Sequence, residues 1–107
     1  MYVQMITLHA PVDQIEKLRR LVADEYLPAI RTRSGFVAAH LLEQVDDPEA
    51  AQLIIYWNNQ AAVEHGQATG VLSGSVASIA ARMPGLHIQR QSYIVNVTVE
   101  NKESAAV

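Results

Sequence analysis

Residues 34–65 constrain the fold more than any other part of the chain. This stretch, SGFVAAHLLEQVDDPEAAQLIIYWNNQAAVEH, contains two β-rich apolar runs, 36–45 and 53–57. The acidic proline turn at 46–49 separates them. Trp57 closes the second run, and either of the two asparagines that follow is suited to cap a helix, because its side chain accepts from a free backbone N–H. The pattern predicts a hairpin that leads directly into a helix.

An amphipathic helix is predicted before this hairpin, over residues 12–32. Apolar side chains recur at helical spacing from Ile15 to Ala29. Asp13 followed by Glu16 resembles a capping box, and acidic side chains suit a helix N-terminus. Proline lacks a backbone N–H and crowds the preceding turn, so Pro28 is expected to kink or split the helix near Tyr26.

Two further strands complete the predicted plan. Residues 2–9 (YVQMITLH) indicate the first strand, and 86–99 contain the last, which we expect to be best formed from Gln91 onward. The segment before the last strand, residues 66–83, is glycine-rich. It is expected to be a loop leading into a short helix, followed by a Pro-Gly turn. The order is therefore βαββαβ, with helices on an antiparallel sheet.

Length and composition indicate one domain, residues 1–99, with a frayed tail at 100–107. A chain of 107 residues that is 50% hydrophobic can form a core. The net charge of −3 and the mixing of basic with acidic residues along the first helix argue against nucleic-acid binding. No cysteine, signal peptide or long apolar run is found, so we expect a cytoplasmic protein without disulfides or a membrane span.

The strands carry more apolar surface than two helices can cover. In the run 53–57, Leu53, Ile55 and Trp57 alternate with Ile54 and Tyr56, so both faces of that strand are apolar. The second strand shows the same lack of polar alternation. Helices cover one face, so the other is expected to be an association site, most simply for the same face of a second copy. The sequence therefore predicts a homodimer.

Three motifs carry a family resemblance: Gly35-Phe36 at the start of the second strand, Asp46-Asp47-Pro48 in the hairpin, and WNNQAAVEH from Trp57 to His65. With them the chain resembles the antibiotic biosynthesis monooxygenase family, over about residues 1–99. The resemblance implies an α+β, ferredoxin-like antiparallel sheet and a dimeric α+β barrel. Members of the family include cofactor-independent oxygenases of aromatic polyketides, quinol oxygenases, haem-degrading enzymes and proteins of unknown role.

His65 is the candidate catalytic residue. Imidazole titrates near neutral pH, so His65 could serve as a base or orient a substrate hydroxyl. The resemblance implies that a His or Trp near this position faces a pocket between helix and sheet. We expect that pocket between the sheet and 66–83, with His65 at its edge. The alternative is a packing or capping histidine ahead of Gly66.

Other candidates are the polar or aromatic groups that interrupt apolar strands. Trp57 could form one wall of an aromatic pocket, although a core or interface anchor is the better interpretation. Polar groups within an apolar cavity suit a polycyclic or quinone-like ligand. The predicted substrate-binding residues are Trp57, Tyr56, Asn58, His40 and Asn96, with Arg90 as a further interruption. Each could equally be a rim residue or a satisfied hydrogen-bonding group, and Asn58 a helix cap.

No metal or cofactor is expected. The histidines His9, His40, His65 and His87 lack the spacing of a zinc site. Haem degradation in the resembled superfamily is tied to a strand-one Asn with a Trp and a His on the helical side. Here strand one has Gln4, and the Trp ends a strand.

Two functions remain open. One is a cofactor-independent monooxygenase acting on a small electron-rich aromatic, such as a hydroquinone, anthrone or quinol. The other is a non-catalytic dimer that binds a small hydrophobic or aromatic ligand, or acts in a stress response. A pocket in which His65 and another polar group converge favours the enzyme, whereas a cavity filled by Phe36, Met5 and Leu41 favours the binding protein.

Overall fold

A computed structural model describes residues 1–61 and 76–101 of the chain. Its strands are β1 (Tyr2–His9), β2 (Phe36–Glu43), β3 (Ala50–Trp57) and β4 (His87–Ile94). They form one antiparallel sheet in the order β2-β3-β1-β4. The helices are α1 (Ile15–Leu21), α2 (Leu27–Ile30) and α4 (Val76–Arg82), and the π-helical turn η1 (Val22–Tyr26) joins α1 to α2. The expected ferredoxin-like α+β fold is confirmed.

The long helix is divided where Pro28 was expected to divide it. Pro28 lies in the first turn of α2, and the backbone N–H of Leu27 donates to the carbonyl of Val22, a bond of π-helical span. Because proline has no N–H to continue the regular ladder, the preceding turn widens. Tyr26, the last residue of η1, is thereby buried beneath the helix.

The predicted capping box is wrong. Gln14 occupies the N-cap position of α1 and makes no side-chain cap hydrogen bond. Asp13 has φ +63°, a left-handed conformation that differs from the extended backbone of an N-cap residue. Glu16 nevertheless lies in the first helical turn, where its charge suits the helix dipole.

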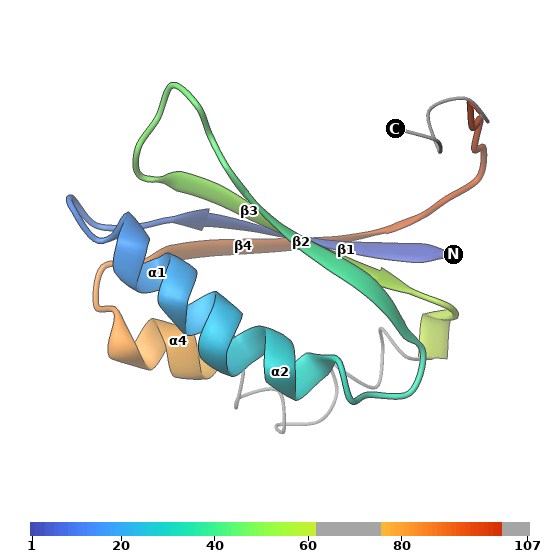
Figure 1. The fold of residues 1–107 in the computed structure, drawn as a ribbon, viewed down its shortest axis with the longest axis horizontal. Coiled ribbons are helices and arrows are strands. Elements are labelled where there is room, and N and C mark those ends of the chain that lie inside the picture. The colour runs from blue at the N-terminus through green and yellow to red at the C-terminus, as the bar shows by residue number, and fades with distance from the viewer. Residues whose placement is uncertain (62–75, 102–107) are drawn as a thin grey trace.

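The helices cover one face of the sheet (Figure 1). We call this the inner face, and the opposite one the outer face. Buried and more exposed residues alternate along β3, with Ala51, Leu53, Ile55 and Trp57 facing the helices. These side chains pack with others in one core. Its other members are Ile6, Leu8, Ala10, Leu18, Leu21, Val22, Tyr26, Ile30, Ile79 and Met83.

Three strands differ from their expected boundaries. β3 begins at Ala50, three residues before the predicted run at 53–57. β2 stops at Glu43, and the fully exposed Val45 belongs to the turn. β4 begins at His87 and ends at Ile94, so its best-formed part precedes the one predicted. The reason is the position of its partner. Ile94 pairs with Tyr2, the first residue of β1, and the N–H of Val95 donates to the carbonyl of Met1.

Candidate functional site

His65, the predicted catalytic residue, lies outside the described residues. The predicted pocket between the sheet and 66–83 is described only at its C-terminal end, where α4 confirms the expected short helix. There Ile79 and Met83 are buried in the core, with 5% and 0% of their surfaces exposed. At this end, side chains fill the space between helix and sheet.

Trp57 is anchored on the inner face at the end of β3. Only 2% of it is exposed, and its ring meets Phe36 edge to face, with centroids 5.8 Å apart. Its indole Nε1 is buried and has no hydrogen-bond partner in the described part of the chain. A buried donor without an acceptor is costly and uncommon in native proteins. The position fits a core anchor.

The other predicted binding residues lie elsewhere. His40 and Tyr56 share the outer face, where their rings meet edge to face with centroids 5.9 Å apart. Asn58 is exposed beyond the end of β3, and its backbone N–H donates to the carbonyl of Gly35. Asn96 is exposed beyond the end of β4. The sheet therefore separates the His40–Tyr56 pair from Trp57, and these residues do not converge on one pocket.

Sequence reasoning did not single out the buried polar residues Gln4 and Tyr26 as candidate site residues, and it named Arg90 only as an interruption of its strand. Tyr26 and Gln4 are buried, with 2% and 8% exposed, and Arg33 is half-buried. Arg90 pairs with Ile6 across the sheet, so it lies on the inner face, and it is exposed there. The signal for Gln4 was present, because it interrupts an apolar alternation of β1. Tyr26 was concealed within the apolar stripe of the helix.

Burial raises the pKa of Tyr26 to about 12, and the opposing charges of Arg33 and Arg90 lower it by less. The hydroxyl therefore stays protonated and able to donate near neutral pH. The spacing of residues in the sequence did not predict that burial would raise the pKa of Tyr26.

This shift predicts a loss of stability at high pH. In the unfolded chain the phenol ionises near pH 10, whereas the folded protein holds the proton until about pH 12. The stabilising contribution is complete below pH 10 and is lost as pH rises through 12, about 3 kcal/mol in all. Urea unfolding of wild type and Tyr26→Phe at pH 8, 10 and 11 measures it. Between pH 8 and 11, the unfolding free energy of Tyr26→Phe should fall by less than that of wild type. An equal fall in both proteins would show that Tyr26 does not cause this pH dependence.

Two open grooves lie along the described surface. One, of about 410 Å³, runs between the helix and the β2 edge and includes Leu27, Arg31 and Phe36. The other, of about 310 Å³, lies by the β2–β3 hairpin and includes Thr7, Glu43 and Gln52. None of the predicted site residues lines either groove. The side chains expected to fill a cavity also divide, since Phe36 and Leu41 pack against the core while Met5 lies on the outer face.

Within residues 1–61 and 76–101, no three His, Cys, Asp or Glu side chains are placed to hold a metal ion. No helix in those same ranges is long and apolar enough to cross a membrane.

Comparison with known proteins gives a sequence match and several structural ones. The profile of the antibiotic biosynthesis monooxygenase family matches residues 1–71. No curated protein sequence matches significantly. A candidate antibiotic biosynthesis monooxygenase from Deinococcus radiodurans superposes with a TM-score of 0.76 at 18% identity, covering 94% of this chain and 98% of that one.

Two further solved structures share the fold. SnoaB from Streptomyces nogalater, a cofactor-independent oxygenase solved as a point mutant, has a TM-score of 0.74 at 16% identity, with 94% of this chain and 98% of that one covered. The haem degrader MhuD from Mycobacterium tuberculosis, with two haems in its active site, has a TM-score of 0.63 at 16% identity, with coverages of 92% and 100%. At these identities the likeness concerns the fold.

Proposed function

The chain belongs to the antibiotic biosynthesis monooxygenase family, and we propose that it is a cofactor-independent monooxygenase acting on a small electron-rich aromatic such as a hydroquinone, anthrone or quinol. Two findings support the proposal. The chain belongs to this family, and it shares its fold with SnoaB, a cofactor-independent oxygenase. The observation in this chain that carries it is the buried Nε1 of Trp57, which has no partner among the described residues. That donor faces the apolar helix side of the sheet, where a flat aromatic ligand would find a dry environment.

The proposed chemistry needs little from the protein beyond binding and proton transfer. An electron-rich hydroxyaromatic that loses a proton becomes an anion able to pass an electron to O₂ itself. His65 is proposed as the base that takes this proton. The Trp57 indole N–H is proposed to donate to the resulting oxyanion, and the surrounding apolar side chains keep water away from it.

The same proposal includes a homodimer formed through the outer face. No helix among residues 1–61 and 76–101 covers this face of the sheet (Figure 1). Val3, Met5, Ile54 and Tyr56 on its central strands are nevertheless apolar or aromatic and only half-buried. Leu42 and Tyr93 extend this surface, with 48% and 47% exposed. A second copy placed face to face would cover it and give a total buried area above roughly 2,000 Å², as in obligate dimers.

The alternative is a non-catalytic dimer that binds a small hydrophobic ligand or acts in a stress response. One observation favours it: His40, Tyr56, Asn58 and Asn96 do not converge with Trp57. A binding protein requires an apolar cavity and one or two donors but no assembled proton-transfer group.

Oxygen uptake decides between the two functions. The purified protein is mixed with a naphthohydroquinone, an anthrone or benzohydroquinone, with a metal chelator and no added flavin or haem. We expect oxygen consumption well above the spontaneous rate for at least one substrate. The product should have gained one oxygen atom from O₂, as anthraquinone from anthrone or a hydroxyquinone from a hydroquinone, with the other oxygen atom released as water. If calorimetry shows that the protein binds these compounds, but oxygen uptake stays at the spontaneous rate, the result would support the non-catalytic binding protein.

A further inference from the structure

A strand-like sequence continues beyond the last strand of the sheet. Residues 95–100 have the sequence VNVTVE, with a valine at every second position. This period and these β-branched side chains are typical of a strand with one buried face. Yet β4 ends at Ile94, and Val97 and Val99 are 82% and 91% exposed. A segment with the pattern of a strand therefore lies outside the sheet.

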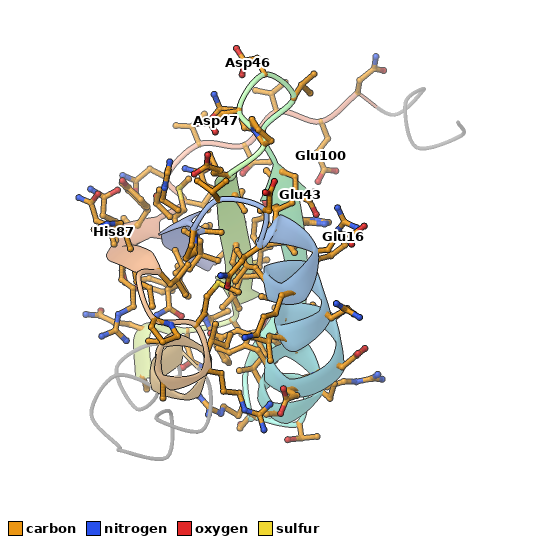
Figure 2. All side chains as sticks on the ribbon, turned by 90° about the vertical axis from the view of Figure 1, so that its left-hand side faces the viewer. Glu16, Glu43, Asp46, Asp47, His87 and Glu100 are labelled. Atoms are coloured by element: carbon orange, nitrogen blue, oxygen red, sulfur yellow. The ribbon has the colours of Figure 1, made fainter. Side chains whose placement is uncertain are left out.

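We call residues 96–101 the arm. The N–H of Val95 donates to the carbonyl of Met1, but no backbone hydrogen bond joins residues 96–100 to another part of the described chain. Figure 1 shows the arm leading onward from the end of β4, and Figure 2 shows Glu100 on it; in both views it lies away from α4. An extended segment whose backbone groups are unpaired is suited to pair with the edge of another sheet.

The free edge of β2 offers such a partner. β2 lies at one border of the sheet, next to β3. Because the N–H of Gln44 donates to the carbonyl of Ala50, strand alternation directs the backbone groups of Ala39, Leu41 and Glu43 away from β3. On that side these three residues have no backbone partner within 1–61 and 76–101. The edge thus presents unpaired donors and acceptors in a row.

The two borders of the sheet differ in character. β4, at the other border, has exposed polar side chains along most of its length, which protect an edge from pairing. β2 has the mostly apolar sequence FVAAHLLE, and an open groove of about 410 Å³ runs beside it. Leu27, Phe36 and Ala39 are among the residues that line this groove. The apolar border at β2 is therefore the better site for an added strand.

We propose that in the homodimer each arm pairs as an additional strand with the β2 edge of the other copy. Extended from β4, the arm would keep Val97 and Val99 in phase with Tyr93 on the outer face. Six extended residues span about 20 Å, enough to reach a facing sheet roughly 10 Å away and pair there. The inference rests on the homodimer of the proposed function and adds a backbone connection between its two copies.

Amide hydrogen exchange, measured by NMR on the full-length protein, tests the pairing. In the wild-type dimer, alternate amides within 96–100 and the amides of Ala39, Leu41 and Glu43 should exchange at least about 10²-fold more slowly than in monomeric Ile54→Asp. The amide of Gln44 bonds within each copy and should be protected in both proteins. Free exchange of the arm amides in the wild-type dimer would overturn the proposal. Equal protection in the monomer would also overturn it, because the arm would then pair within its own chain.

A second variant tests the arm through the dimer itself. Val97→Asp combined with Val99→Asp should raise the dimer dissociation constant at least about 10²-fold, because four carboxylates would enter the interface. Val12→Asp combined with Val45→Asp adds the same charges at exposed valines outside the arm and should dimerise like wild type. Sedimentation over a range of concentrations measures both variants. Equal dissociation constants for the two would remove the arm from the interface, whatever the state of Ile54→Asp.

These results are separable from the proposed function. A wild-type monomer would overturn the arm pairing and the homodimer together, and oxygen uptake would still decide the activity. Oxygen uptake by a dimer with freely exchanging arm amides would leave the monooxygenase standing and remove this inference. Protected arm amides without oxygen uptake would do the reverse.

Discussion

Replacing Ile54 by aspartate is expected to separate the proposed homodimer into folded monomers. Ile54 lies on the outer face in the middle of the sheet, between Met5 on β1 and His40 on β2. In the proposed interface its side chain would be removed from water. An unpaired carboxylate there costs several kcal/mol per protomer, and the change occurs twice in a symmetric dimer. The dimer dissociation constant should therefore rise by at least about 10³-fold.

Sedimentation velocity at micromolar concentration measures this change. Wild type should sediment as a dimer, and Ile54→Asp as a monomer of 11.8 kDa with an unchanged far-UV circular dichroism spectrum. Val45→Asp introduces the same charge at a fully exposed hairpin residue and should remain dimeric. A wild-type monomer at that concentration would end the dimer proposal. A dimeric Ile54→Asp would show that copies associate through another surface.

The order of elements could be predicted because it depends on short-range patterns. The acidic proline turn at 46–49 and the run ending in Trp57 specify the hairpin, and Pro28 specifies the break in the long helix. Gly35, with φ +89°, makes the turn into β2. These features are local, so neighbouring residues alone were sufficient.

Strand ends and the helix cap were less predictable, because they depend on partners distant in sequence. β4 ends at Ile94, which pairs with Tyr2 at the start of β1, although β-prone residues continue to Val99. The prediction of a capping box at α1 was wrong because Asp13 adopts a left-handed conformation, which residue type alone does not specify. Tertiary pairing and backbone conformation decided both cases.

The candidate site was predicted only in part. Trp57 was correctly favoured as a core residue, because a large apolar side chain at a strand end usually packs inside. Strand periodicity also puts Tyr56 and Trp57 on opposite faces, yet both were placed among the binding residues. Burial of Tyr26 beneath the helix depends on tertiary packing, so no spacing in the sequence could reveal it.

The catalytic proposal predicts that His65→Ala lowers turnover by about 10²-fold or more, as removal of a general base often does. In wild type, the rate should fall as pH drops below the range in which an imidazole is neutral, because only the neutral ring accepts the substrate proton. The variant should lose this part of the pH profile, while its dimer and its far-UV spectrum persist. Steady-state oxygen uptake between about pH 5 and 9 measures both effects.

His87→Ala is the matched control for this experiment, since it removes an exposed imidazole from the outer face at the start of β4 and should leave turnover unchanged. Equal turnover in His65→Ala and wild type would show that His65 is not the base, and the proton would then have to pass to solvent or another group. If the protein is a binding module, His65→Ala should weaken one ligand only modestly. The rate and affinity of this single variant thus separate the two proposed functions, because a base contributes to the transition state and a packing or binding residue to affinity or stability.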